Sequence, residues 1–141
     1  MESVHNKNVL CYGSKIVEFL QSKINLIAVY FYGSILNESF GNESDIDIAI
    51  ITEDITNPVR LYEIAVDISV LVKRDIHLVD FVSACDTLRI EILKNKSVIF
   101  CSNDAKRLYY EMIALTSYQK LNEEREIAIR ANYGDNVWMS L

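Results

Sequence analysis

The chain has 141 residues, half of them hydrophobic, and its formal net charge at neutral pH is −6. This length corresponds to one domain with enough apolar side chains for a substantial core. A protein that binds nucleic acid non-specifically needs a basic surface that displaces counterions from the phosphates. The acidic balance therefore argues against a polymerase that acts on long DNA, and it predicts no direct nucleic-acid partner.

The apolar segments and the cysteines indicate the compartment. The longest apolar runs have the length of strands, and the polar N-terminus lacks the features of a signal peptide, so no membrane association is expected. The three cysteines, Cys11, Cys85 and Cys101, are odd in number and form no C-x-x-C pair. They argue against a disulfide framework or a zinc site. We expect buried, reduced thiols and a cytoplasmic location.

The hydrophobic pattern predicts four helices and four strands. In chain order they are a helix over 8–23, strands over 26–32 and 45–51, a helix over 58–73, a strand over 75–81, a helix over 83–95, a strand over 97–101 and a helix over 105–130. Asn57 is predicted to cap the helix that begins at Pro58, and Asp104 to cap the last helix. This order predicts an α/β (α+β) fold, in which helices flank a small mixed sheet.

Helical spacing also predicts which side chains point to the core. In the helix over 58–73 these are Leu61, Ile64, Ala65, Ile68 and either Leu71 or Val72, and in the helix over 83–95 they are Leu88, Ile92 and Leu93. In the last helix, Leu108, Met112, Leu115 and either Tyr118 or Gln119 recur at helical spacing. The continuous apolar run over 26–32 is typical of a central strand that is covered on both faces.

Two short motifs carry the candidate chemistry. The strand over 26–32 runs into Gly33 and Ser34, and ten residues later the next strand opens with Asp45 and Asp47. Alternate residues of a strand point to the same face, so the two carboxylates should lie together while Ile46 points to the core. Paired carboxylates favour Mg²⁺, which binds through one or two carboxylates and the phosphates of a substrate. A glycine corner followed by a serine presents backbone N–H groups and a hydroxyl to an anion.

This arrangement of Gly-Ser, ten residues and Asp-x-Asp resembles the signature of the polymerase-β-like nucleotidyltransferases, and the chain is similar in size to their minimal (MNT) branch. The resemblance implies the fold of that superfamily with a long C-terminal helix. It also implies Asp45 and Asp47 as catalytic, Mg²⁺-binding residues, with ATP as substrate. Gly33, Ser34 and Ser44 would bind the nucleotide, Gly33 and Ser34 by holding its β and γ phosphates.

The third carboxylate of the family is replaced in this chain. Where relatives carry an aspartate on the strand after the central helix, the alignment places His77. A neutral imidazole can accept a proton but adds no negative charge to a Mg²⁺ pair. Three alternatives follow: His77 acts as the general base, Asp75 replaces the missing carboxylate, or catalysis is slow or absent.

A second departure follows Ser34. Many minimal nucleotidyltransferases carry an arginine or lysine in this loop, whereas this chain has Ile35, Leu36, Asn37 and Glu38. Less positive charge should therefore reach the triphosphate, and we expect nucleotide affinity to depend mainly on Mg²⁺ and on backbone N–H groups.

Stand-alone chains of this kind resemble the antitoxins of HEPN/MNT toxin–antitoxin pairs. The resemblance implies an enzyme that transfers AMP from ATP to a tyrosine of a partner HEPN ribonuclease toxin, with which it forms a hetero-oligomer. The closest alternative is a catalytically weak or inactive antitoxin that neutralises the toxin by binding alone. A third alternative is transfer of a nucleotide to a small molecule, although such enzymes carry an added helical domain that is absent here.

The last ten residues, 132–141, form a possible partner-docking tail of one nucleotidyltransferase domain that spans 1–141. Trp138 and Met139 are residue types enriched at the centres of interfaces. Packing of the tail on its own core and a frayed terminus are the alternatives. The charged run over 123–126 is interpreted as a solvated helix face.

Overall fold

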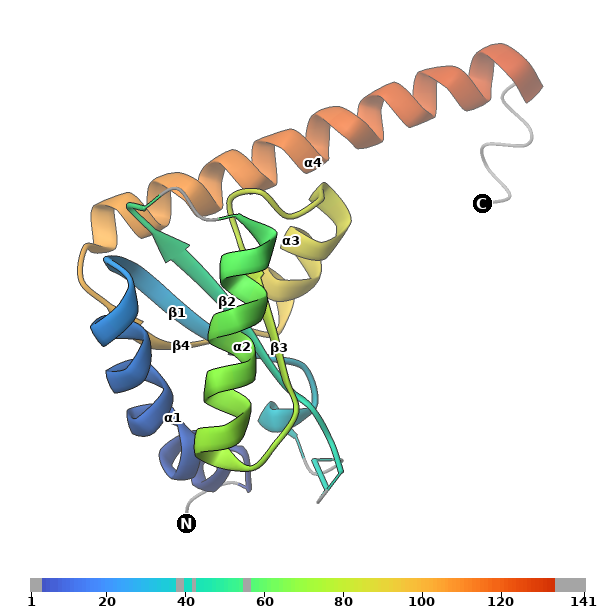
Figure 1. The fold of residues 1–141 in the computed structure, drawn as a ribbon. Helices are drawn as coiled ribbons and strands as arrows, with labels where there is room; N and C mark the ends of the chain where they lie inside the picture. Colours follow the sequence, from blue (N-terminus) through green and yellow to red (C-terminus); the bar gives the residue numbers. More distant parts are fainter. Residues whose placement is uncertain (1–3, 38–39, 42, 55–56, 134–141) are drawn as a thin grey trace.

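The computed structural model describes residues 4–37, 40–41, 43–54 and 57–133. The elements in chain order are α1 (Val4–Lys23), β1 (Leu26–Tyr32), the short 3-10 helix η1 (Gly33–Leu36), β2 (Ile46–Thr52), α2 (Pro58–Val72), β3 (Ile76–Asp80), α3 (Asp86–Lys94), β4 (Ser97–Cys101) and α4 (Asp104–Tyr133). The strands form one sheet in the order β3-β2-β1-β4 (Figure 1). Since β1 is antiparallel to β2 and β4 while β3 is parallel to β2, the sheet is mixed, as predicted.

The predicted elements are all present, with small differences at their ends. The first helix begins at Val4, four residues before the predicted start, and it continues through Gly13 without interruption. Asn57 caps α2 as predicted, since its side chain accepts a hydrogen bond from the Arg60 N–H at 2.8 Å. The prediction for α4 was wrong: Asn103 accepts the N–H of Lys106, and Asp104 is the first residue of the helix.

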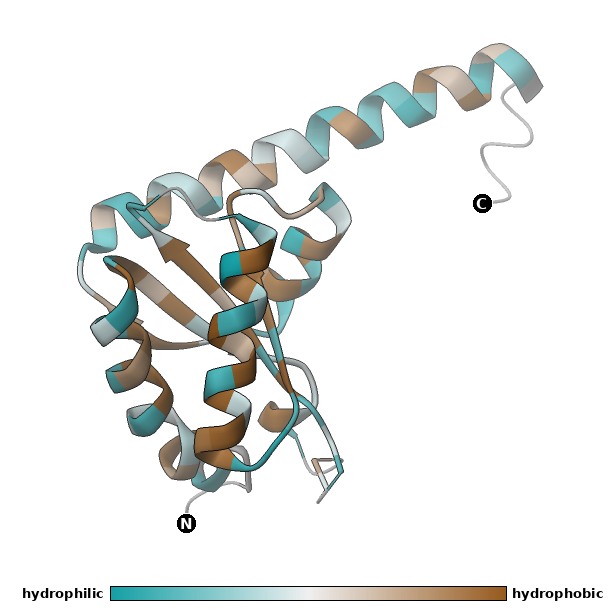
Figure 2. Cartoon of the chain, viewed as in Figure 1, coloured by the Kyte–Doolittle hydropathy of each residue, from teal (hydrophilic) through white to brown (hydrophobic). Residues whose placement is uncertain are grey.

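Two layers of helix cover the two faces of the sheet. On one face, Ile46, Ile48 and Ile50 of β2 pack against α1 and α2 (Figure 1). On the other face, Ala49 and Ile51 pack against α3 and α4. Figure 2 shows the hydrophobic colour along the strands and on parts of α1 and α2. Every residue of β1 is buried, so the prediction of a central strand covered on both faces is confirmed.

The inward faces of α2 and α3 are as predicted. Ile64, Ile68 and Ile92 are buried in the core. Five further residues of the predicted set pack against it, namely Leu61, Ala65, Val72, Leu88 and Leu93. Of the two alternatives at the end of α2, Val72 contacts the core and Leu71 is exposed.

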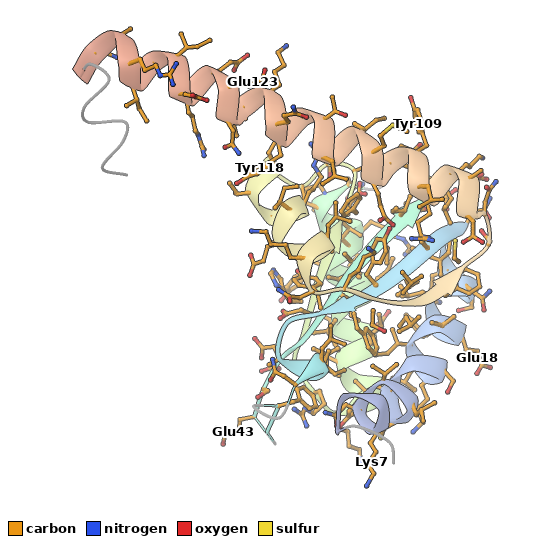
Figure 3. The ribbon with its side chains drawn as sticks, turned by 180° about the vertical axis from the view of Figure 1, so that it is seen from behind. Lys7, Glu18, Glu43, Tyr109, Tyr118 and Glu123 are labelled. Atoms are coloured by element: carbon orange, nitrogen blue, oxygen red, sulfur yellow. The ribbon has the colours of Figure 1, made fainter. Side chains whose placement is uncertain are left out.

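The apolar face predicted for α4 is wrong. Leu108, Met112 and Leu115 are all more than half exposed, whereas Ala114 and Glu111 are buried. Helix α4 packs on the sheet through a neighbouring side, where the Tyr30 hydroxyl donates to Glu111 Oε2 at 2.8 Å. Arg107 Nη1 donates to the same oxygen at 2.6 Å, and Lys96 Nζ is 3.2 Å from Glu111 Oε1. The polar network determines the packing face. In Figure 3, Tyr109 lies on the outer side of the helix and Tyr118 on the side of α3.

The cysteines differ in part from expectation. All three are free, but Cys11 and Cys85 are exposed, so the prediction of buried thiols was wrong. Cys11 lies on the solvent side of α1, and Cys85 occupies the capping position of α3. Among the described residues, no helix is long and apolar enough to span a membrane.

Candidate active site

The strands β1, β2 and β3 bring polar side chains together where β1 ends and where β2 and β3 begin. Tyr32, at the end of β1, is paired with Asp47 of β2, and Asp47 is paired with His77 of β3. All three alternate with residues that face α1 and α2, so their side chains lie on the face of α3 and α4. The strand register therefore places the carboxylate of Asp47 beside the imidazole of His77.

Asp47 is the half-buried centre of this group. Burial raises the pKa of its carboxyl above the ordinary value, because removal from water disfavours the charged form. The adjacent His77 imidazole lowers the pKa of Asp47, and the charges of Asp45 and Glu91 raise it. Asp45 is exposed and directly precedes β2, which begins one residue later than predicted. The charge of Asp45 therefore disfavours the charged form of the half-buried Asp47, and a bound cation would relieve this repulsion.

Gly33 brings the backbone into close contact with Asp47. Its φ is +76°, a left-handed conformation that favours glycine. A Cβ at this position would also collide with Oδ2 of Asp47. Both the backbone angle and the close approach therefore require glycine, and they place the start of η1 directly against the carboxylate. Ser34 follows within η1 and is partly buried.

His77 lies on the open side of Asp47. Its Nδ1 is 3.4 Å from Oδ1 of Asp47, and 62% of its side chain is exposed. Asp75, the alternative carboxylate, lines a separate hollow with Ser44 and Arg74. Among the residues that the structure describes, no three His, Cys, Asp or Glu side chains are arranged as a set of metal ligands. The candidate metal site thus consists of the carboxylates of Asp45 and Asp47.

The loop that leads into Asp45 is held by Arg74, which the sequence analysis did not single out. The Arg74 guanidinium donates to the carbonyl oxygen of Ser44, at 2.8 Å from Nη2, and to that of Gly41. Its plane stacks over the Phe40 ring at 4.2 Å and also lies over Tyr12. The Ser44 hydroxyl accepts the Gly41 N–H at 2.9 Å, so this side chain is used within the loop. An arginine directly after a helix gives no sequence signal for such contacts.

A groove lies on the other side of Asp47, lined by Tyr32, Gly33 and Glu91 among others. Glu91 comes from α3, which the sequence analysis treated only as a core helix. Burial raises the pKa of Tyr32 to about 12, with further contributions from the charges of Asp47 and Glu91. The groove and the carboxylate of Asp47 therefore belong to one electrostatic environment.

The comparison with known families agrees with this geometry. Residues 14–105 match the profile of the family described as "Polymerase beta, Nucleotidyltransferase". The chain belongs to this family. The matched residues extend from α1 through the whole sheet and end in the first turn of α4. This nucleotidyltransferase therefore carries the predicted fold, and most of α4 lies outside the matched region.

Relatives of this nucleotidyltransferase include antitoxins. The protein adenylyltransferase MntA of Shewanella oneidensis is 26% identical over 117 residues, which cover 82% of this chain and 84% of MntA. A crystal structure of a toxin–antitoxin with AMP-PNP matches with a TM-score of 0.76 and 25% identity, over 84% of this chain and 95% of that one. The MNT antitoxin in complex with the tri-AMPylated HEPN toxin of Shewanella oneidensis matches with a TM-score of 0.72 and 25% identity, over 88% and 97%.

Proposed function

We propose that this nucleotidyltransferase is an antitoxin that transfers AMP from ATP to a tyrosine of a partner HEPN-domain toxin. The observation that carries the proposal is the contact between Gly33 and Asp47, which joins the candidate phosphate-binding corner to the candidate metal site. The similarity to MntA and to the MNT antitoxin bound to its AMPylated toxin supports AMP as the transferred group and a HEPN protein as the acceptor. An ATP-dependent reaction also agrees with the cytoplasmic location expected from the sequence.

The donor set at the site fits Mg²⁺. Both candidate ligands, Asp45 and Asp47, offer carboxylate oxygens, which this ion prefers. The raised pKa of Asp47 reflects burial and the neighbouring charge of Asp45, and a divalent cation between them would offset both effects. When bound, Mg²⁺ would lower the pKa of the attacking hydroxyl and neutralise the charge that develops on the leaving group.

The side chains have distinct tasks in this reaction. The acceptor oxygen attacks the α-phosphorus, a new P–O bond forms, and the bond to the β-phosphate oxygen breaks with release of pyrophosphate. Gly33 and Ser34 would orient the β and γ phosphates through backbone N–H groups. His77 is the base on the open side of Asp47, so it can take the proton of the acceptor hydroxyl.

Mass spectrometry of the toxin tests this proposal. The candidate HEPN toxin is incubated with the protein, ATP and Mg²⁺, and we expect mass increases of one or more AMP units. Asp45→Ala and Asp47→Ala should abolish the increase and leave the complex with the toxin intact. The matched control Asp67→Ala, which removes an exposed acid of α2, should transfer AMP as well as the unchanged protein. An unmodified toxin under these conditions would contradict the proposal.

One observation favours a second candidate, an antitoxin that acts by binding alone. His77 stands where the family carries a carboxylate, and it contributes no negative charge to a metal pair. His77→Asp distinguishes the candidates: if the missing carboxylate limits catalysis, this variant should transfer AMP faster. If His77 already serves as the base, transfer should stay the same or fall. A non-covalent complex without modification by either protein would support the binding-only antitoxin.

A further inference from the structure

Strand β3 is an open edge of the sheet. In the strand order β3-β2-β1-β4 it pairs with β2 alone, and no other strand of the described residues lies beyond it (Figure 1). The outer N–H and C=O groups of an edge strand can pair with another chain, and native proteins commonly block them with lysine or proline. The sequence of β3, IHLVD, contains neither residue. The edge is therefore able to accept a further strand.

The pairing of β2 with β3 identifies the residues whose backbone groups face this edge. Ile46 is paired with Ile76, and the Ile46 N–H donates to the carbonyl oxygen of Asp75 at 2.9 Å. Successive residues of a strand direct their backbone groups to opposite sides, so the odd-numbered residues of β3 bond to β2. Ile76 and Leu78 consequently direct their N–H and C=O groups to the open edge.

A hollow of about 350 Å³ extends along this edge between α2 and α3, and all five residues of β3 line it. The helices add a mainly apolar wall, with Leu61, Tyr62, Ala65 and Leu88. The described residues that line the hollow include no lysine or arginine, and Asp80 contributes a carboxylate. A phosphate group would therefore meet no positive charge there. Backbone groups beside an apolar wall instead match an uncharged or basic polypeptide segment.

The strand register connects the edge with the candidate active site. Tyr32, Asp47 and His77 are paired residues of three adjacent strands and lie on one face of the sheet. A residue that pairs with His77 from a further strand would extend this row, and its side chain would lie on the same face. Since 62% of the His77 side chain is exposed, a tyrosine at that position would have access to the candidate base.

The direction of the added strand follows from the same register. Antiparallel pairing is slightly more stable per residue than parallel pairing. Because the backbone groups of His77 belong to the β2 side, a residue opposite it would form a non-hydrogen-bonded pair, in which side chains lie closer. Its two neighbours would exchange backbone hydrogen bonds with Ile76 and Leu78. Their side chains would lie on the face of α2, which Ile76 and Leu78 share.

We propose that the HEPN toxin presents its acceptor tyrosine in an extended segment, which pairs with β3 as an antiparallel edge strand and places the tyrosine opposite His77. The residues directly before and after the tyrosine pack against α2, so apolar side chains are favoured there. The inference rests on the proposed function, because it names the part of the toxin that the same site recognises. Pairing with a second copy of this chain would cover His77 and exclude the acceptor, so the edge is assigned to the toxin.

Linear peptides from the toxin test the pairing, with the unchanged enzyme, ATP and Mg²⁺. Each carries at its centre the tyrosine that mass spectrometry identifies in the intact toxin, and each is longer than the five residues of β3. N-methylation of either residue next to the tyrosine removes an N–H that faces β3, and it should lower kcat/KM for AMP transfer about tenfold. The matched control is N-methylation of the tyrosine itself, whose N–H faces away, and it should have little effect.

Tyr62→Ala tests the apolar wall on the enzyme. Tyr62 is 71% exposed on α2, so this truncation should leave the melting temperature unchanged. Loss of the contact should raise KM for the peptide about fivefold or more, while kcat and the affinity for ATP stay the same. The matched control Tyr109→Ala removes an exposed tyrosine from the outer side of α4 and should behave like the unchanged protein (Figure 3). An unchanged KM in Tyr62→Ala would contradict the contact.

Two results with the peptides would overturn the inference. One is an intact toxin that is modified while its linear peptide is not. The other is a peptide series in which methylation beside the tyrosine has no effect, or in which only methylation of the tyrosine lowers transfer. A dimer of this protein that Tyr62→Ala dissociates, detected by analytical ultracentrifugation, would assign the edge to a second copy instead. If the intact toxin is not modified, the proposed function fails together with the inference, so the two failures are distinguishable.

Discussion

Asp47 is a side chain whose charge the folded protein tolerates poorly. Its raised pKa means that the carboxyl favours folding while it is protonated and that this contribution is lost as the pH rises through the folded-state pKa. At neutral pH without divalent cations, Asp47→Asn should therefore raise the melting temperature. The difference should vanish below about pH 4, where the carboxyl is protonated in both states.

The melting temperatures of the unchanged protein and of the Asp47→Asn variant also report metal binding. Mg²⁺ should raise the melting temperature of the unchanged protein, because a ligand that binds only the folded state stabilises it. The Asp47→Asn protein should respond weakly. A variant that melts at a lower temperature than the unchanged protein at neutral pH would contradict the electrostatic account of this residue.

Gly33 should tolerate no side chain. Gly33→Ala places a Cβ into Oδ2 of Asp47 and forces an L-residue into a positive φ, so we expect a loss of about 1 to 3 kcal/mol in the free energy of unfolding. Chemical denaturation measures this loss, and nucleotide binding should fall with it. Gly13→Ala is the control, because the space around Gly13 in α1 accommodates a methyl group. Equal stability of the two variants would be evidence against the close approach at Gly33.

Some of these residues could be found from the sequence and others could not. Gly33, Asp45 and Asp47 are recognisable because they are close in the chain and their spacing is fixed by one strand, a short connection and the next strand. Glu91 and Arg74 lie 44 and 27 residues from Asp47 in the chain, and only the packing of α3 and of the end of α2 brings them to the site. No local pattern distinguishes them from other charged residues.

At the scale of elements, the loop before β2 depends on one arginine. Arg74 contacts the Gly41 and Ser44 carbonyls and the Phe40 ring, and it holds both sides of the turn that delivers Asp45. Arg74→Ala should lower the free energy of unfolding by roughly 1.5 to 3 kcal/mol, the range for hydrogen bonds to a charged group. It should also raise the Mg²⁺ concentration needed for half-maximal transfer.

Arg74→Lys separates charge from geometry. Lysine keeps the charge but lacks the planar group that spans two carbonyls, so it should recover only part of the lost stability and metal affinity. Arg60→Ala, an exposed arginine on α2, is the control and should behave like the unchanged protein. Full recovery by lysine would mean that charge alone holds the loop.

The sequence predicts where the helices and strands lie better than it predicts which side of a helix packs on the core. The strands and α2 follow from their apolar residues, because helices cover both faces of β1 and α2 packs one face on the sheet. The packing side of α4 could not be predicted in this way, because Leu108, Met112 and Leu115 form an apolar stripe that looks like a core face. The side of α4 that packs on the sheet carries Glu111 instead. The Glu111 carboxylate contacts Tyr30 of β1, Lys96 just before β4 and Arg107 of α4 itself.

At the scale of the molecule, α4 projects beyond the sheet and α3 (Figure 1). Its buried residues, Glu111 and Ala114, belong to its first half, whereas Glu123 lies on the projecting half (Figure 3). A chain that ends at Leu121 should therefore unfold cooperatively, and its free energy of unfolding should lie within about 1 kcal/mol of that of the full chain. Denaturation curves of the two proteins measure this difference. A larger loss would show that the second half of α4 contributes to the core.

A shorter truncation, which removes only residues 134–141, tests the proposed docking tail. Trp138 and Met139 lie outside the described residues, and their contact with the toxin remains a prediction. If the tail docks, removal of residues 134–141 should weaken toxin binding without affecting the melting temperature. Unchanged affinity for the toxin would refute the contact.

The shifts in the pairing of β1 with its neighbours determine where a residue can be inserted into this strand or deleted from it. Pairing with β2 shifts between Leu26 and Ala28, and pairing with β4 shifts between Val29 and Tyr30. An inserted or deleted residue near Tyr32 would turn its phenol toward α1 and α2 and move Gly33 off the carboxylate. The extra residue of the first shift lies on β1, whereas that of the second lies on β4, since Val29 and Tyr30 pair with Phe100 and Val98. Deletion of the extra residue of β1 would instead restore regular pairing and leave the downstream residues in phase. Natural variation in the length of this strand should therefore be confined to the end far from Gly33.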